Sequence, residues 1–129
     1  MANVRTGARR SPLLWLFFAM KGRVSRHIYW LAYVLFVSVN GVVLGQLLGG
    51  EEASLSRLAE LGGPFVILAT IYANVAVAVK RLHDVGYSGF LAVAMFVPLV
   101  NLVFTIWIGI LPGNDGPNAY GDRPDRVPA

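Results

Sequence analysis

Cysteine is absent from the 129-residue sequence, and histidine occurs only at His27 and His83. Without cysteine, the chain has no disulfide, no thiolate nucleophile and no cysteine-based zinc or iron–sulfur site. Two histidines alone are too few for a metal site, because such a site needs three or four ligands. We therefore expect neither a metal nor another cofactor.

Charged residues are also scarce. They make up 14% of the sequence, whereas a soluble domain usually carries about 25%. Hydrophobic residues make up 56% of the chain. So little polar surface indicates that lipid surrounds much of the molecule, and it predicts an integral membrane protein rather than a soluble domain.

The first half of the chain lacks acidic residues before Glu51, and this part is strongly basic. Because Lys and Arg are enriched on the cytoplasmic side of membranes, we expect a cytoplasmic N-terminus, residues 50–60 outside, and residues 80–90 back inside. A basic segment next to apolar runs also favours anionic lipid as the partner. No nucleic-acid-binding motif is present, so we expect no nucleic acid partner.

Long uncharged runs predict an all-α fold with about three transmembrane helices, since a bilayer core needs roughly 20 apolar residues. The predicted spans cover residues 28–49, 61–79 and 90–111. Three spans would place the turn-rich C-terminal tail, residues 112–129, outside. Pro98 interrupts the third run, however, and leaves open a re-entrant hairpin that would return this tail to the cytoplasm.

The N-terminal segment, residues 1–20, is predicted to be a basic tail followed by a short helix. The apolar run from Pro12 to Met20 is too short to span a membrane. We expect a helix that lies in the membrane interface, with Trp15, Phe17 and Phe18 in lipid. Residues 21–111 then form the membrane domain.

Small residues recur at helical spacing in the first two predicted spans, at Gly41, Gly45 and Gly49 and at Ala69 and Ala73. Such rows let two helices approach closely. These rows are consistent with two arrangements. They form an interface with a second copy or another membrane protein, or they pack against each other inside one subunit. Polar side chains near the spans, Asn40, Gln46, Asn74 and Asn101, are expected to bond to each other or to backbone.

The stretch "VKRLHDVGYSGF" places four ionisable side chains between two apolar runs: Lys80, Arg81, His83 and Asp84. Arg81 and Asp84 are three residues apart and can meet on one helix face. "MKGRVSRHIYW" adds Arg23 and Arg26 on the same predicted side, so we expect Asp84 to be the counter-ion of one of them. The resulting basic face suits anionic headgroups, because guanidinium groups match phosphate oxygens. Its candidate residues are Arg23, Arg26, Arg81, His83 and Asp84.

The same cluster allows an alternative function. A neutral His83 beside Asp84 would be an oriented general base in a membrane-embedded enzyme or a carrier for a polar ligand. No Gly-x-Ser-x-Gly elbow surrounds Ser25 or Ser88, so no catalytic residue is assigned. The favoured function is that of a small structural or interaction protein of the membrane, and not an enzyme.

Four segments of the chain resemble a known family: "GRVSRHIYW", "VKRLHDVGYSGF", the run containing Pro98, and "PGNDGPNAYGDRP". In order and spacing they are similar to the bacterial inner-membrane family called domain of unknown function 805. This resemblance implies a small multi-span protein of the bacterial inner membrane, and it implies no reaction. Lys80 stands where the family more often has Arg, and His27 where an acid is common, which leaves Asp84 as the acid expected on this face.

Overall fold

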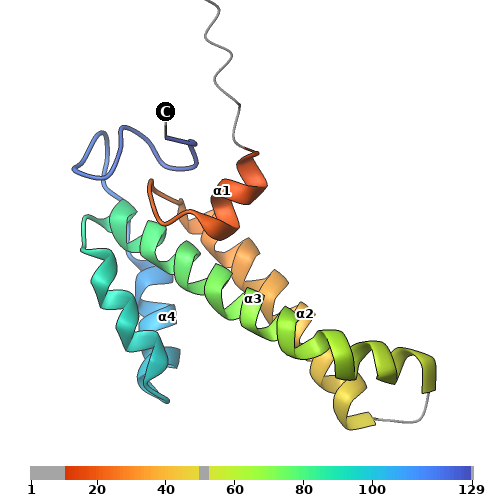
Figure 1. The fold of residues 1–129 in the computed structure, drawn as a ribbon. Helices are drawn as coiled ribbons and strands as arrows, with labels where there is room; N and C mark the ends of the chain where they lie inside the picture. Colours follow the sequence, from red (N-terminus) through yellow and green to blue (C-terminus); the bar gives the residue numbers. More distant parts are fainter. Residues whose placement is uncertain (1–10, 50–52, 129) are drawn as a thin grey trace, which may run out of the picture.

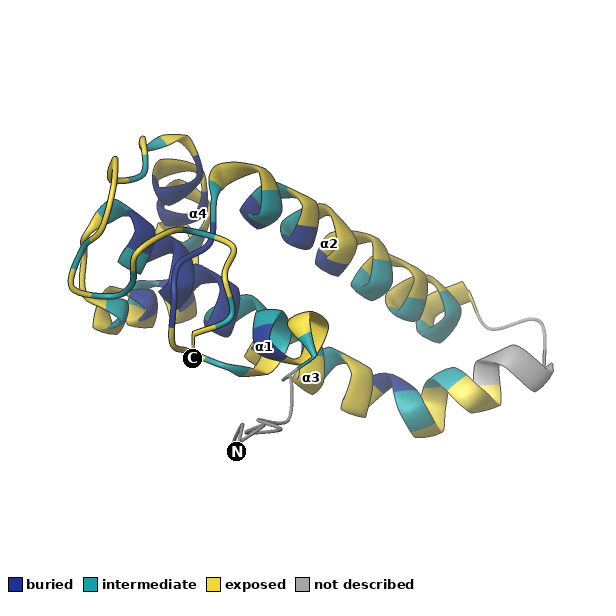
Figure 2. Ribbon diagram, turned by 90° about the horizontal axis from the view of Figure 1, so that it is seen from above, coloured by how far each residue is buried: buried dark blue, intermediate teal, exposed yellow. Residues whose placement is uncertain are grey.

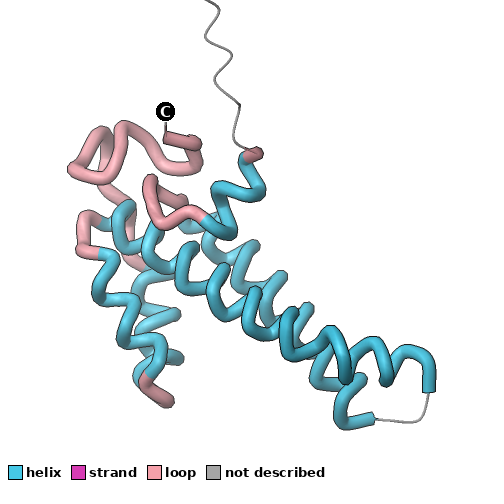
Figure 3. Tube along the Cα trace, viewed as in Figure 1, coloured by secondary structure: helices cyan, strands magenta, loops and turns pink. Residues whose placement is uncertain are grey.

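The computed structural model describes residues 11–49 and 53–128, with the backbone alone for residues 53–56. Within these ranges the chain is helical, and its β pairing is limited to one isolated bridge between Asn118 and Gly121 (Figure 3). The all-α prediction is thus confirmed. The basic residues before Ser11 and the acidic residues 51–52 lie outside the described part. The elements are α1 (Pro12–Phe18), α2 (Arg26–Gly49), α3 (Ala53–Val85), the 3₁₀ helix η1 (Gly89–Phe96) and α4 (Val100–Ile110).

The two longest helices, α2 and α3, run side by side (Figure 1). At 1.5 Å per residue they measure about 36 Å and 50 Å, so each exceeds the roughly 30 Å core of a bilayer. Both are long and apolar enough to cross a membrane. Only 11% of the most apolar window of α2 and 33% of that of α3 are buried inside the chain. Helices in the core of a soluble protein would be covered far more completely, so these surfaces are suited to contact with lipid.

The third apolar run does not form the continuous helix that we expected over residues 90–111. It folds into two short antiparallel arms, η1 and α4, joined by a turn at Pro98 and Leu99 (Figure 1). Leu99 has a φ of 67°, and the side-chain amide of Asn101 closes the turn by donating to the Met95 carbonyl at 2.7 Å. Because proline lacks an N–H, it interrupts the helical ladder at this point. Each arm measures about 16 Å, roughly half the thickness of a bilayer core.

The hairpin returns the chain to the end of the helix pair where α3 finishes. There the C-terminal turns of α3 meet the segment 19–25, the end of α4 and the tail 111–128, and we call this region the capped end. Buried residues concentrate in it, whereas the opposite half of the α2–α3 pair is mostly exposed (Figure 2). We call that half, residues 38–49 and 57–70, the open end.

Helix α1 lies against α3, and its orientation differs in part from the expected one. Trp15 was expected in lipid, but it is 6% exposed, and its indole N–H donates to the Lys21 carbonyl at 2.9 Å. Phe18 is exposed, as lipid contact requires, and Leu13 and Leu14 are exposed with it, whereas Phe17 is half-buried. A buried indole needs an acceptor for its N–H, and the backbone just after α1 supplies one.

Two of the four polar side chains near the spans, Asn40 and Asn101, form the expected bonds to backbone carbonyls, those of Phe36 and Met95. Asn40 of α2 exchanges hydrogen bonds with the Thr70 hydroxyl of α3 at 3.0 and 3.1 Å. Asn101 accepts from the Thr105 hydroxyl at 3.1 Å. These pairs satisfy groups that would be costly to expose to hydrocarbon.

Candidate functional site

Four ionisable side chains lie together in the capped end: Arg23, Lys80, Arg81 and Asp84. We call them the charge cluster. The three cations are 0% exposed and Asp84 is 3% exposed. Buried charges of this kind are stable only when they are paired and hydrogen-bonded, so the partners of each one define what the cluster does.

Asp84 is held between two arginines. One carboxylate oxygen accepts from Nε of Arg23 at 3.0 Å and lies 2.9 Å from its Nη2, and the other accepts from Nη1 of Arg81 at 2.5 Å. The predicted Arg81–Asp84 pair and the predicted ion pair with an arginine of the first segment are both confirmed. The carboxylate therefore joins the segment before α2 to the end of α3.

The other N–H groups of Arg23 are directed at the backbone of the tail. Nη1 donates to the carbonyls of Gly116 and Gly121 at 2.6 and 3.1 Å, and Nη2 donates to that of Asn114 at 2.7 Å. The tail thus wraps around one guanidinium group. Charge-assisted bonds are stronger than neutral ones, so this contact orders a segment that has no helix of its own.

Further contacts fasten the tail on either side of Arg23. Asp125 accepts from the Ser25 amide at 2.8 Å, and its own amide donates to the Arg23 carbonyl at 2.8 Å. The Asn114 amide donates to the Asp84 carbonyl at 2.7 Å. A Cβ on Gly113 would overlap the Asp84 carboxylate, so only glycine fits at this point of the turn.

Arg81 and Lys80 bind the ends of two other helices. Nε of Arg81 donates to the Ile108 carbonyl at 2.9 Å, and Nη2 donates to that of Leu111. Lys80 donates to the carbonyls of Trp15 and Ala19 at the end of α1, and its ammonium lies 5.3 Å from the centre of the Trp15 ring. Cations satisfy the unpaired carbonyls of a helix C-terminus and complement its dipole. This role of Lys80 was not predicted, because the carbonyls that it binds leave no signal in the sequence.

His83 and Asp84 do not form the pair on which the alternative function depends. Among the described residues, the carboxylate accepts from Arg23 and Arg81 and not from His83. Nδ1 of His83 lies 3.1 Å from the Gly22 carbonyl, which only accepts, so Nδ1 carries a proton. The imidazole also stacks on Tyr120 at 3.9 Å with an interplanar angle of 2°. A carboxylate sandwiched between two guanidinium groups does not orient a base, and the geometry therefore gives no support to the enzyme or carrier alternative.

The candidate headgroup-binding residues separate into two groups. Arg23 and Arg81, which we expected to contact headgroups, are buried, and their donors are directed at acceptors of the protein. Arg26 is exposed and makes no ion pair with any residue that the structure describes. Lys21 and His27 are exposed beside it.

The small residues that were predicted to pack helices together also fall into groups with different surroundings. Among the described residues, no atom of another part of the chain lies within 4 Å of a Cβ placed on Gly41, Gly45 or Gly49, so the described helices do not pack against this row. The close approach of α2 and α3 occurs instead at Gly63, where a Cβ would lie 3.0 Å from Val43. The remaining two candidates differ: Ala73 is buried, and Ala69 is exposed.

No group of acidic residues and histidines that would hold a metal occurs in the described part of the chain. In the same part, every buried side-chain nitrogen and oxygen has a hydrogen-bond partner. A binding or catalytic centre usually keeps polar groups available for its ligand, whereas this cluster uses them internally. Its bonds hold the segment before α2, the end of α3 and the tail together, and we call this arrangement the clamp.

Comparison with known proteins identifies relatives over most of the chain. The profile of the family described as "Protein of unknown function (DUF805)" matches residues 17–122. Inner membrane protein YhaI of Escherichia coli K12 is 32% identical over 105 residues, which cover 80% of this chain and 83% of that protein. Inner membrane protein YhaH is 30% identical over 117 residues, or 84% and 88%. Uncharacterized protein YiiR is 31% identical over 132 residues, or 83% and 86%.

No solved structure matches the chain. The names of YhaI and YhaH, together with two long apolar helices, support a location in the inner membrane. The comparisons indicate no enzymatic activity, in agreement with a cluster whose polar groups are all engaged. The motifs, the length of the matched region and the relatives agree. The chain therefore belongs to the DUF805 family, whose function is unknown.

Proposed function

We propose that the protein is a non-enzymatic component of the inner membrane that contacts anionic headgroups through exposed basic residues of its capped end. The observation that carries the proposal is the separation of the charges. The buried cations are engaged by the protein itself, whereas Lys21, Arg26 and His27 are exposed at the same end. Exposed cations at headgroup level are attracted by the negative surface of the cytoplasmic leaflet.

The proposal includes a topology of two spans and one re-entrant hairpin. Helices α2 and α3 would cross the membrane, and the η1–α4 hairpin would enter it from the capped end and return. The excess of Lys and Arg around that end favours its placement in the cytoplasm, together with the N-terminus. The tail would then face the cytoplasm, because Arg23 holds its backbone at the capped end.

Cysteine labelling tests this topology, because the natural chain contains no cysteine. We expect Ser88→Cys and Ala119→Cys to resist a membrane-impermeant maleimide in intact spheroplasts and to react after lysis. Glu60→Cys, near the open end, should react in intact spheroplasts. Reaction of Ala119→Cys from outside, with Ser88→Cys protected, would overturn the re-entrant hairpin.

Lipid retention during purification tests the headgroup contact. In detergent, the wild-type protein should retain phosphatidylglycerol in preference to phosphatidylcholine of the same chain length, and the preference should fall as salt rises. The double variant Lys21→Gln with Arg26→Gln should lose the preference. Arg57→Gln at the open end is the control and should keep it. An unchanged preference in the double variant would contradict the proposal.

We also propose that the Gly41, Gly45 and Gly49 row contacts a second copy of the chain. The supporting observation is the open space beside each glycine, which a packed helix of the same subunit does not fill. In lipid, small residues allow the close backbone approach that drives helix association. The double variant Gly41→Leu with Gly45→Leu should lower self-association in chemical cross-linking, and Val42→Leu should not. Equal cross-linking in both would exclude this interface.

A further inference from the structure

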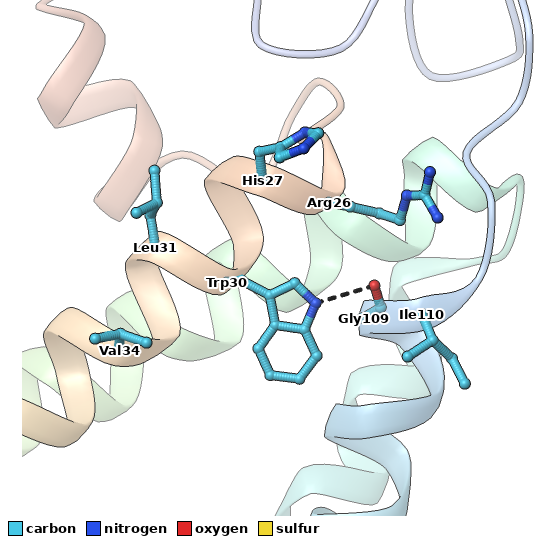
Figure 4. A pocket seen from close by; sticks show the side chains of 7 residues that line it. All are labelled: Arg26, His27, Trp30, Leu31, Val34, Gly109 and Ile110. Atoms are coloured by element: carbon cyan, nitrogen blue, oxygen red, sulfur yellow. Dashed lines mark hydrogen bonds between the residues drawn. The ribbon is translucent and has the colours of Figure 1, made fainter.

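An open groove of about 610 Å³ lies between the first turns of α2 and the last turn of α4 (Figure 4). Its residues on α2 recur at helical spacing and therefore share one face of that helix. The groove is lined by Arg26, His27, Trp30, Leu31, Val34, Gly109 and Ile110. Its volume falls within the about 300–1,000 Å³ that is typical of small-molecule sites.

The groove has one polar end and one apolar end. Arg26 and His27 lie at the first turn of α2, and Figure 4 shows Leu31 and Val34 further along the same helix. Ile110 adds an apolar side chain from α4. A ligand that matches this pattern carries a negative charge at one end and hydrocarbon at the other.

The wall between the two helices is fixed before any ligand arrives. The Trp30 indole N–H donates to the Gly109 carbonyl at 3.2 Å, and this bond is drawn in Figure 4. A Cβ on Gly109 would lie 2.5 Å from the Trp30 ring, so the ring packs directly on the backbone of α4. Such a preformed wall lowers the cost of ordering the site when a ligand binds.

Within the described structure, no acidic side chain forms an ion pair with the cations at the polar end of the groove. Asp125 of the tail is engaged with the Ser25 amide, and Asp84 is engaged with Arg23 and Arg81. Arg26 makes no ion pair with a described residue. An exposed guanidinium group offers several N–H donors in a planar fork that fits phosphate oxygens, and His27 adds a ring N–H donor.

We propose that this groove is a discrete site for one anionic phospholipid. Its phosphate would bind between Arg26 and His27, and one acyl chain would lie along Leu31, Val34 and Ile110. The inference rests on the proposed function, since it assumes that the capped end lies at headgroup level, and it adds to it a stoichiometric site with a defined hydrocarbon wall. Basic pockets between membrane helices are known to bind acidic headgroups.

Native mass spectrometry of the protein in detergent tests the site, because it counts the lipids that each molecule retains. Phosphatidylglycerol and phosphatidylcholine with identical acyl chains are titrated separately. We expect one phosphatidylglycerol to bind more tightly than phosphatidylcholine by on the order of tenfold, because both carry the phosphate but phosphatidylcholine also carries a trimethylammonium group that Arg26 repels. Arg26→Gln should remove this difference.

Two matched substitutions separate the groove from the general basic face. Leu31, in the groove, is 67% exposed, and Leu68, on α3 outside the groove, is 64% exposed. Leu31→Trp should fill the groove and lower retention of the tightly bound phosphatidylglycerol by on the order of tenfold, while Leu68→Trp should leave it unchanged. Thermal unfolding of both variants checks that each remains folded.

The outcomes distinguish this inference from the proposed function. If Leu31→Trp retains the lipid as well as Leu68→Trp does, while Arg26→Gln loses it, the headgroup contact stands and the groove site is wrong. If the wild-type protein shows no preference for phosphatidylglycerol, both proposals fail. Equal binding of glycerol phosphate without acyl chains would also overturn the groove site, because its apolar wall would then contribute nothing.

Discussion

The capped end and the open end of the molecule are stabilised in different ways. At the capped end, charged side chains are buried and bonded to one another and to backbone carbonyls. At the open end, α2 and α3 approach closely at Gly63 and Val43, with the Asn40–Thr70 bond as a polar contact between them. Most of their apolar surface faces outward (Figure 2). The capped end therefore carries its own core, whereas the open end needs lipid or a partner to cover it.

The glycines illustrate the same difference. At the capped end, Gly109 and Gly113 leave no space for a Cβ, because the Trp30 ring and the Asp84 carboxylate occupy it. At the open end, Gly41 and Gly45 face space that the subunit does not fill. A glycine in the sequence thus predicts a close approach, but the structure shows whether the neighbour belongs to the same chain.

The largest expected effect follows from removing the acid of the clamp. Asp84→Asn should lower the free energy of unfolding by about 3–5 kcal/mol, because it leaves two buried guanidinium groups without a counter-charge. Denaturant titration in detergent measures this change. Asp122→Asn, an exposed acid of the tail, is the control and should have little effect. Similar losses in both variants would show that Asp84 is not the centre of the clamp.

A second effect is expected when residue 23 keeps its positive charge but loses the planar guanidinium group. Arg23→Lys should cost about 1.5–3 kcal/mol, since an ammonium group cannot reach Asp84 and three tail carbonyls together. Hydrogen exchange of residues 112–124 should also become faster. The exposed Arg123→Lys serves for comparison. Unchanged exchange in the Arg23 variant would mean that the tail is held by other contacts.

A third prediction compares glycines at the two ends. Gly109→Ala should destabilise the protein by about 1–3 kcal/mol, because the methyl group displaces the Trp30 ring. Gly45→Ala meets open space and should be neutral or stabilising by up to about 1 kcal/mol, as for alanine in a helix. Unfolding in detergent measures both. Equal destabilisation would remove the distinction between the two ends.

The smallest effect concerns the polar contact of the open end. Asn40→Leu should cost about 0.6 kcal/mol, the average for hydrogen bonds between membrane helices. Ser38→Ala removes a bond to the Val34 carbonyl of its own helix and gives the matched control. A loss of several kcal/mol in the Asn40 variant would show that the open end has a polar core of its own.

The sequence allowed the fold to be predicted where one run of residues decides the local structure. The uncharged runs at 28–49 and 61–79 are both helical, and Arg81 and Asp84, three residues apart, form their pair. For the third run the sequence left two alternatives, a single span or a hairpin broken at Pro98, because its hydropathy is continuous; the turn at Pro98 and Leu99 agrees with the second. Trp15 was assigned to lipid for a similar reason: an indole suits either an interface or a core with an acceptor.

By itself, the sequence determined the helical class, the apolar character of the spans and the supply of cations and acid around the capped end. The tertiary structure decided which cations are available. Arg23 and Arg26 are indistinguishable by composition, yet one is wrapped by the tail and the other is exposed at a groove. Backbone carbonyls occur at every residue and leave no signal in the sequence, so only the path of the tail shows that three of them meet at Arg23.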